Sequence, residues 1–548
     1  MEGEEEIPQY SKEVARGSFW SLLGNIAFKL VSFLYVILIA RAASQDDIGL
    51  FYLALSVVSI ISIFSDIGLA GSLTRYIPYF EGRNEKGKIR DLLNISYIVS
   101  SIAAVVLMAL LWWQADAIGE AYHNPLLAEA IRMLVSYLFL VNLLRLGTSA
   151  LQGFADIRSM QYVNNMQNGF KLILTAAFFY LYGASVLTLS AAFIISHIPA
   201  VIMAIISTGR KTASFPSGGG TSISTHQLFG EIVPFGIMLN IVTLFWSMTA
   251  YADRLLLGYF IDPSLSTETV AVYSIAITMA TVLMLFPGSV ANIFLPVMSR
   301  LAGKNEPVHM RAILETSQRW SLLITLPMGL VMIIFASDML GIFYGQAYAG
   351  GALTMAILTF GFLIQALSYV LLFALAALRL VKLELKLAFI VTMVNVILNA
   401  LLIPIYGMEG SAMASVASCV VMTILLVHYG NKLFSFSFPA EIYKLVLAAI
   451  ITFAIVFFMK PYASAVIPLL PMDVGSLQPY INKIIYLVYL GILGAISTAI
   501  FIVFAIILKC FRNEDVLLMK KALHRAKMPP QLISVATAIA SFGVGVRK

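Results

Sequence analysis

The feature that most constrains this chain is a succession of apolar segments, each long enough to cross a lipid bilayer. A helix needs roughly 20 apolar residues to span the hydrocarbon core, and the sequence supplies about fourteen such segments. Of the 548 residues, 60% are hydrophobic and only 11% are charged, whereas roughly a quarter of a soluble globular chain is charged. Lipid must therefore solvate most of the surface, so the sequence predicts an all-α polytopic membrane protein.

The predicted spans follow one another along nearly the whole chain. We expect them near residues 17–40, 48–70, 92–113, 128–150, 163–182, 184–207, 232–258, 269–295, 318–337, 351–378, 384–405, 408–430, 441–459 and 481–508. The acidic start of the chain and the length of the first apolar run argue against a cleaved signal peptide, so we expect a retained first helix.

Basic residues alternate between loops in a way that predicts the topology. If the N-terminus is cytoplasmic, the outer loops carry few cations beyond Arg41, Lys460 and Lys483, whereas the inner loops carry many. This is the positive-inside pattern, and it favours an even number of spans with both termini in the cytoplasm. The net charge of +7 is thereby explained by topology. We expect a multi-pass protein of the cell (cytoplasmic) membrane, and no nucleic-acid partner.

Two pairs of short motifs suggest an internal repeat. Ile48–Tyr52 resembles Val270–Tyr273, and Leu181–Gly183 resembles Ile405–Gly407. The offset is about 220 residues in each case, which corresponds to six spans and therefore to parallel repeats. Such repeats are typical of transporters that bind substrate between two halves near mid-membrane.

The repeat leads to a prediction of five regions. They are an N-terminal six-helix bundle (1–207), a cytoplasmic linker (208–231), a C-terminal six-helix bundle (232–430), two additional transmembrane helices (431–508) and a basic cytoplasmic tail (509–548).

Three cations lie within predicted spans of the first half, namely Lys29, Arg145 and Lys171. An ionisable residue in a membrane span is costly and is a functional candidate by default. We expect these three residues to bind the phosphate of an anionic headgroup, because fixed cations can replace the water that the phosphate loses. For Lys29 the alternatives are snorkelling to the interface or pairing with Asp66.

A second set of polar residues is predicted to contact substrate or to take part in gating. Its members are Asp66, Asp253, Arg254, Asn395 and Asn399. The amides of the second half, with Asn240 among them, could bind sugar hydroxyls. Two alternatives remain open, because Asn395 and Asn399 are spaced for hydrogen bonding between helices and Asp253 and Arg254 could simply fix a helix end. His197 is expected to be a packing residue.

No arrangement of residues typical of an enzyme is found. The sequence lacks a glycine-rich loop followed by Lys-Ser or Lys-Thr, so we do not expect it to hydrolyse ATP. Gly218–Gly220 has no such lysine and is interpreted as linker. There is also no paired His/Glu metal signature. We therefore predict no catalytic residue, no cofactor and no metal.

Several short segments occur in an order that resembles a known family. They are Trp20 through Ala42, Asp47–Tyr52, Asp66–Leu69 with Arg75, then Asp253, Gly258, Phe260 and Tyr273, then Phe343–Gly345 with Tyr348, and finally Asn395, Asn399, Pro404, Gly407 and Gly410. Together they resemble the polysaccharide transporter (O-antigen/oligosaccharide flippase) family of the multidrug/oligosaccharidyl-lipid/polysaccharide exporter superfamily. The likeness covers most of residues 15–430, and it departs from the family at Ala43–Gln45, where Leu-Gly-Pro is usual.

This resemblance implies a fold and a function. It implies two six-helix bundles around a cavity that opens to alternate sides, with a polyprenyl-(pyro)phosphate-linked oligosaccharide as cargo. The last two spans would offer a groove for the lipid tail. Expected partners are this lipid-linked oligosaccharide, membrane lipid and a glycan polymerase or glycosyltransferase machinery.

Other functions remain open at this point. The main alternative is a cation-coupled small-molecule antiporter of the multidrug-extrusion branch, which would share the fold. A membrane glycan polymerase would need a large outer loop with clustered acids or arginines, but the outer run 461–480 has a single acid, Asp473. An adaptor without transport activity would not need cations inside the membrane.

Overall fold

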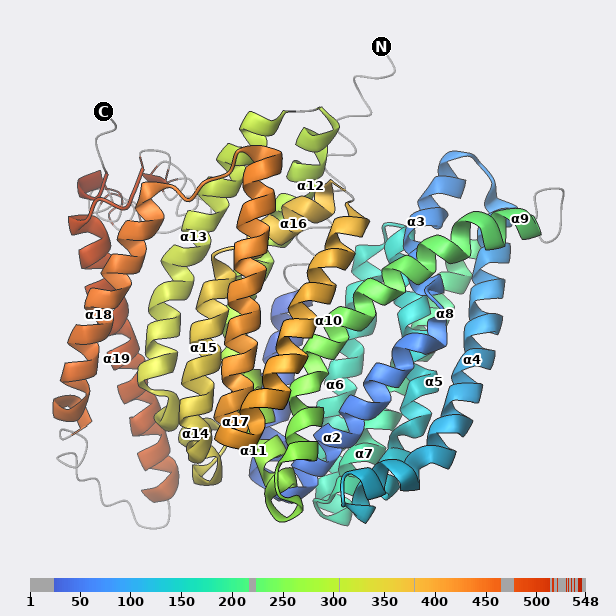
Figure 1. Cartoon of the computed structure of the whole chain (residues 1–548), viewed down its shortest axis with the longest axis horizontal. Helices are drawn as coiled ribbons and strands as arrows, with labels where there is room; N and C mark the ends of the chain where they lie inside the picture. The colour runs from blue at the N-terminus through green and yellow to red at the C-terminus, as the bar shows by residue number, and fades with distance from the viewer. Residues whose placement is uncertain are drawn as a thin grey trace. The chain divides into compact units, whose positions relative to one another are not determined.

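The computed structural model describes residues 24–215, 223–304, 306–378, 380–464 and 478–512, together with scattered positions between 515 and 544. These residues are helical almost throughout (Figure 1), and the β-type pairing among them is one isolated bridge between Phe511 and Val544. Twelve of the described helices are long and apolar enough to cross a membrane. The prediction of an all-α polytopic membrane protein is therefore confirmed.

The chain divides into two compact units. The first contains the described residues of Met1–Ile277 and Arg379–Ser418, and the second those of Thr278–Leu378 and Cys419–Lys548. Two helices, α11 (Pro263–Ala280) and α17 (Val381–Phe434), begin in the first unit and end in the second.

The first unit holds all the residues of the predicted site. Besides parts of α11 and α17, it contains the helix Gly24–Ala42, α2 (Gln45–Ser62), the 3₁₀ turn η1 (Ile63–Asp66), α3 (Leu69–Gly82), α4 (Lys86–Ala121), α5 (Pro125–Gly153), α6 (Ile157–Tyr182), α7 (Val186–Ile195), α8 (His197–Thr212), α9 (Thr225–Gln227), the π-helical turn η2 (Leu228–Ile232) and α10 (Val233–Phe260).

The second unit contains the C-terminal hairpin. Its elements are η3 (Thr281–Met284), α12 (Leu285–Gly303), α13 (Pro307–Ile334), α14 (Ala336–Phe343), η4 (Gln346–Gly351), α15 (Ala352–Ala366), α16 (Tyr369–Ala377), α18 (Ala440–Ser464) and α19 (Gln478–Ile507). In Figure 1, α18 and α19 lie side by side, and both helices pack against α13.

The predicted count of fourteen spans differs from the twelve candidates for two local reasons. First, α6 is not among the twelve, and its sequence includes the polar residues Gln161, Asn168 and Lys171. Second, the spans predicted at 384–405 and 408–430 form one 54-residue element that is interrupted at Gly407. Gly407 has φ 59° and ψ −133°, a conformation that glycine tolerates because it has no Cβ. The count of fourteen is compatible with these observations and stays a prediction.

Side-chain caps fix the starts of several helices. The Ser44 side chain accepts a hydrogen bond from the Asp47 N–H at the start of α2, and the Asn124 side chain accepts one from the Leu126 N–H at the start of α5. At α7, Ser185 and Thr188 form a reciprocal capping box. These short polar residues satisfy the backbone N–H groups that a first helical turn leaves without partners.

A backbone break separates α2 from α3. Ile67 and Gly68 both adopt left-handed conformations, with φ values of 51° and 80°. The glycine is required for a second reason, because a Cβ at position 68 would collide with the backbone of Gly236 in α10. The collision is reciprocal, so the two glycines mark the place where the break approaches α10 most closely.

Candidate substrate site

Asp66 lies at the end of η1, beside the break. Its side chain is 4% exposed, and its Oδ1 atom accepts a hydrogen bond from the Gly68 N–H at 2.7 Å. Its Oδ2 atom lies 3.4 Å from Nη1 of Arg145 on α5. The alternative pairing of Asp66 with Lys29 is wrong in this structure, because the carboxylate faces α5 and its charged partner is Arg145.

Arg145 is held by long contacts and keeps an exposed face. Its second terminal nitrogen lies 3.4 Å from the Ser62 hydroxyl, and 28% of its side chain is exposed. Charge-assisted bonds between a guanidinium and a carboxylate are typically about 2.7–2.9 Å long. The Arg145 guanidinium is therefore bound loosely enough to accept a further anionic partner.

Lys171 lies on α6, opposite the helix Gly24–Ala42. Its Nζ atom lies 4.5 Å from the centroid of the Tyr35 ring, a distance typical of a cation–π contact. One turn away, the Ser32 hydroxyl donates to Oδ1 of Asn168 at 3.3 Å. The two contacts have the same sequence offset of 136 residues, so these helices run in the same direction. The Tyr35 hydroxyl and the Asn168 amide nitrogen are buried without a hydrogen-bond partner among the described residues.

Lys29 occupies the same helix as Tyr35 but is exposed. It precedes Ser32 by three residues, so the two side chains lie on the same helix face. The structure thus brings Arg145 to Asp66 and Lys171 to Tyr35, whereas Lys29 has no ion-pair partner among the described residues.

Asp253 is the centre of a buried hydrogen-bond cluster. Its side chain, on α10, is 1% exposed. Four side chains donate to its two oxygens, namely Tyr273 at 2.5 Å, Ser415 at 2.7 Å, Asn399 at 2.8 Å and Asn395 at 3.3 Å. Three of the predicted residues therefore meet here, and the donors are all uncharged groups from α11 and α17. The full set gives this carboxylate strong hydrogen-bond stabilisation without a described ion pair.

Arg254 follows Asp253 in sequence but points elsewhere. Its Nε atom donates to the Ser274 hydroxyl at 2.9 Å, and its guanidinium lies 5.4 Å from the Tyr52 ring centroid. Arg254 therefore links α10 to α11 and to α2, and it does not join the Asp253 cluster.

Two members of the Asp253 cluster were not predicted as site residues. Ser415 lies in the run of small residues from Glu409 to Ser418, which marks close helix packing without marking a particular hydroxyl. Tyr273 was noted only as part of a motif. His197, in contrast, was interpreted correctly as a packing residue, because it is buried beside Phe193 and Tyr137 and contacts Gln167 at 3.2 Å.

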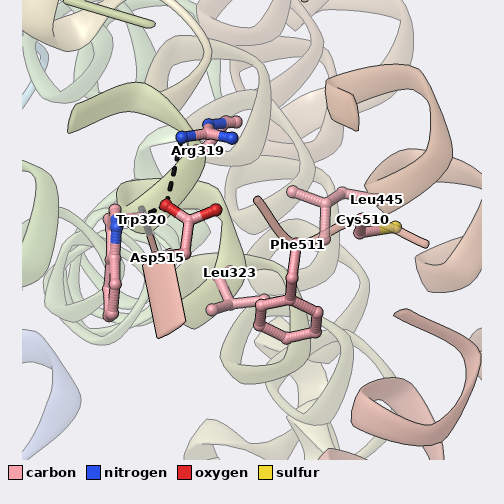
Figure 2. A pocket seen from close by; sticks show the side chains of 7 residues that line it. All are labelled: Arg319, Trp320, Leu323, Leu445, Cys510, Phe511 and Asp515. Atoms are coloured by element: carbon pink, nitrogen blue, oxygen red, sulfur yellow. Dashed lines mark hydrogen bonds and ion pairs between the residues drawn. The ribbon is translucent and has the colours of Figure 1, made fainter. Parts of the chain in front are cut away.

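A separate polar cluster lies in the second unit, around Asp515. Arg319 of α13 donates to Oδ1 of Asp515 at 3.0 Å, and the Trp320 indole N–H donates to the same atom at 3.1 Å. Figure 2 shows both side chains facing Asp515. The pocket there is lined by Arg319, Trp320, Leu323, Leu445, Cys510, Phe511 and Asp515. Burial raises the pKa of the Cys510 thiol to about 11, so this cysteine is a packing residue and not a reactive thiol.

Comparison with known proteins places this arrangement in a family. The model of the polysaccharide biosynthesis protein family matches residues 14–302, and the MatE model matches residues 237–401. The chain belongs to the polysaccharide biosynthesis protein family. The prediction of a polysaccharide transporter of the multidrug/oligosaccharidyl-lipid/polysaccharide exporter superfamily is thereby confirmed, and so is the prediction that it is not an enzyme, because named relatives are flippases.

Two archaeal relatives are similar along most of their length. The probable low-salt glycan biosynthesis flippase Agl15 of Haloferax volcanii is 25% identical over 434 residues, which cover 78% of this chain and 85% of that protein. An uncharacterized membrane protein of Methanocaldococcus jannaschii is 25% identical over 508 residues, which cover 88% of this chain and 96% of the relative.

Solved structures show the same fold at low sequence identity. The lipid II flippase MurJ in an inward closed conformation gives a TM-score of 0.68 at 14% identity, covering 88% of this chain and 97% of MurJ. An inward-facing multidrug resistance MATE family transporter gives a TM-score of 0.61 at 15% identity, covering 76% of this chain and 98% of the transporter.

Proposed function

We propose that this protein flips a polyprenyl-(pyro)phosphate-linked oligosaccharide across the cytoplasmic membrane by alternating access, for the synthesis of a surface polysaccharide or glycan. The observation that carries the proposal is the partly exposed Arg145, a cation within an apolar helix whose acidic partner lies at a long 3.4 Å. A cation in this position can bind an incoming anion. Its pairing with Asp66 has already offset the free-energy cost of its desolvation.

Three residues would divide the work of binding the headgroup. Arg145 would contact phosphate oxygens through its planar guanidinium, which matches their geometry. Lys171 would add a second positive charge, supported by the unpartnered donors of Tyr35 and Asn168. Lys29, exposed on the same helix as Tyr35, would meet the headgroup as it enters or leaves.

The remaining predicted residues would act in gating. In this proposal Asp253 holds α10, α11 and α17 together through Tyr273, Asn399 and Ser415, so that these segments move as one body. The two additional helices α18 and α19 would accommodate the lipid tail. The division into two six-helix bundles, the cytoplasmic position of both termini and an association with a glycan polymerase or glycosyltransferase belong to the same proposal.

Two kinds of relative support this cargo. Agl15 is named as a probable flippase of glycan biosynthesis, and MurJ is named as a lipid II flippase. One name refers to glycan biosynthesis and the other to a lipid, and both name a flippase.

The test is depletion of the protein in its own host, followed by mass spectrometry of lipid-linked oligosaccharides. We expect a complete lipid-linked glycan to accumulate while surface glycan is lost. Wild-type protein should reverse both effects, Arg145→Gln should not, and Arg83→Gln should, because Arg83 is an exposed cation over the Tyr79 ring in the same unit. An unchanged lipid-linked pool would refute the proposal.

A second candidate is a cation-coupled small-molecule antiporter. The observation that favours it is the buried Asp253, which lies within the segment matched by the MatE model and has only uncharged hydrogen-bond donors. Such a carboxylate could exchange a cation during transport. This candidate predicts that depletion changes resistance to cationic toxicants and leaves lipid-linked oligosaccharides unchanged.

A further inference from the structure

Asp66 makes two contacts that serve different parts of the first unit. Its Oδ1 atom accepts the Gly68 N–H at 2.7 Å and thereby stabilises the left-handed turn between α2 and α3. Its Oδ2 atom pairs with Arg145 at 3.4 Å. One buried carboxylate thus joins the backbone break to the cation that we propose as the headgroup ligand.

The same break forms the close contact with α10. Gly68 and Gly236 meet backbone to backbone, and the Ser72 hydroxyl donates to the Ile232 carbonyl at 2.9 Å. The Asn240 amide donates to the Ile63 carbonyl, also at 2.9 Å, which satisfies an acceptor at the end of α2. We call this set of interactions the α3–α10 contact. It depends on the conformation of Gly68, because any other backbone path there would move α3 away from Gly236.

We propose that Asp66 is a positioning residue that couples the anion bound by Arg145 to the α3–α10 contact. This inference rests on the proposed function, in which a phosphate binds Arg145. A phosphate oxygen that binds Nη1 of Arg145 competes with Oδ2 of Asp66, because both accept from that same nitrogen atom. Asp66 then remains as a buried carboxylate without its counter-charge, which is unfavourable in a low-dielectric interior.

Movement of the Asp66 carboxylate toward water lowers its electrostatic free energy. The same movement breaks the hydrogen bond that Oδ1 accepts from the Gly68 N–H. The turn at Ile67 and Gly68 loses its cap, and α3 can then separate from α10. The phosphate shifts the equilibrium between the closed and the separated α3–α10 contact only by the difference in its affinity for these two states. It binds the separated state more tightly, because Arg145 no longer binds Asp66 there.

Two variants of Asp66 separate its two contacts. Asp66→Asn keeps an oxygen that can accept the Gly68 N–H but removes the charge that holds Arg145. Asp66→Ala removes both contacts. Ser65→Ala is the matched control, because the buried Ser65 hydroxyl in the same 3₁₀ turn donates locally to the Ser62 carbonyl and reaches neither Arg145 nor Gly68.

The experiment uses electron paramagnetic resonance to measure the separation of α3 from η2, the turn that leads into α10 and takes part in the α3–α10 contact. Spin labels are placed on cysteines at Glu81 of α3 and Phe229 of η2, both exposed positions, after replacement of the two native cysteines. The full chain is reconstituted in lipid bilayers with and without undecaprenyl phosphate, and lipid binding is measured in parallel.

We expect the lipid to lengthen the label separation in the wild-type protein and in Ser65→Ala. Asp66→Asn should bind the lipid at least as tightly yet keep the short separation, since the cap remains and the charge link is gone. Asp66→Ala should show the long separation without any lipid. A purely structural role would change stability but would not separate lipid binding from the change in distance.

Two results would overturn the inference. One is a lipid response of Asp66→Asn equal to that of the wild type, and the other is an unchanged short separation in Asp66→Ala without lipid. Failure of the proposed function looks different, because the wild-type protein would then bind no undecaprenyl phosphate. The label separation of Asp66→Ala without lipid would still show whether Asp66 stabilises the α3–α10 contact.

Discussion

Each unit of the protein contains an arginine–aspartate pair that joins distant segments, and the two pairs differ in enclosure. In the first unit, Arg145 and Asp66 are 3.4 Å apart, and 28% of the arginine side chain is exposed. In the second unit, Arg319 and Asp515 are 3.0 Å apart, and 3% of the arginine side chain is exposed. Asp515 also accepts hydrogen bonds from the Trp320 indole N–H and the Arg512 backbone N–H.

The difference in exposure between the two pairs indicates which kind of buried charge can bind a transported substrate. A buried pair at short distance with additional hydrogen-bond donors exchanges its partner only at high cost, so Arg319 and Asp515 fix the chain after α19 to α13. A pair whose arginine is partly exposed and held by long contacts can exchange its partner at lower cost. Burial of charge inside a membrane protein therefore does not identify a functional site unless one partner stays accessible.

The largest expected effect breaks the enclosed pair. Asp515→Ala removes the carboxylate that faces Arg319 and Trp320, and loss of one partner of a buried pair typically costs about 3–5 kcal/mol. We expect a clear fall in the thermal unfolding midpoint of the purified protein in detergent. Asp515→Asn should recover part of the loss, because its side-chain oxygen can still accept the Trp320 N–H. An unchanged midpoint in Asp515→Ala would show that this pair is not structural.

Breaking the partly exposed pair of Arg145 and Asp66 should affect binding more than stability. Arg145→Gln removes a charged hydrogen-bond donor, worth roughly 1.5–3 kcal/mol, so binding of undecaprenyl phosphate should weaken roughly 10- to 100-fold. The unfolding midpoint should fall less than in Asp515→Ala, because part of Arg145 already faces solvent or lipid. Calorimetric or fluorescence titration of the reconstituted protein measures the affinity. Equal lipid affinity for Arg145→Gln and wild type would remove the distinction between the two pairs.

The sequence predicted Arg145 and Asp66 as functional candidates but not their pairing, and it predicted neither Arg319 nor Asp515. Arg145 and Asp66 were both identifiable because charge is rare within an apolar run. Their pairing depends on the left-handed turn at Ile67 and Gly68, a conformation that no periodicity of apolar residues reveals. Asp515 was harder still, since its partner Arg319 is separated from it by 196 residues.

The Asp253 cluster shows the same limit of predicting side-chain contacts from the sequence. Asn395 and Asn399 were predictable as a pair because residues four apart share a helix face. Ser415 was not, because its contact with Asp253 depends on how the segment after the kink at Gly407 packs against α10. Local pattern thus predicts which faces are polar, whereas tertiary packing decides which of their hydroxyls and amides meet.

A third, partly buried cation sharpens the comparison. Lys171 faces the Tyr35 ring and has no acidic partner among the described residues. Lys171→Met keeps the length of the side chain and removes its charge, so affinity for undecaprenyl phosphate should fall by roughly three- to tenfold, less than for Arg145→Gln. The unfolding midpoint should stay the same or rise, because an apolar side chain is easier to bury. Lys29→Met is the matched comparison, and it should weaken binding less, since Lys29 is exposed. A larger loss at Lys29 than at Lys171 would place the headgroup nearer the start of the first helix.

The smallest expected effect comes from an exposed pair, which sets the lower end of the scale. Arg132 on α5 contacts Asp116 on α4, and 63% of the aspartate side chain is exposed. Exposed ion pairs contribute about 0–1 kcal/mol, because solvent screens the charges and ordering two side chains costs entropy. Asp116→Asn should therefore leave the unfolding midpoint and the affinity for undecaprenyl phosphate nearly unchanged. Measured beside Asp515→Ala and Arg145→Gln, it tests whether enclosure, and not the mere presence of an arginine–aspartate pair, determines the effect. A loss of stability as large as that of Asp515→Ala would mean that exposure in this structure does not predict the strength of its ion pairs, and the contrast between the two units would lose its physical basis.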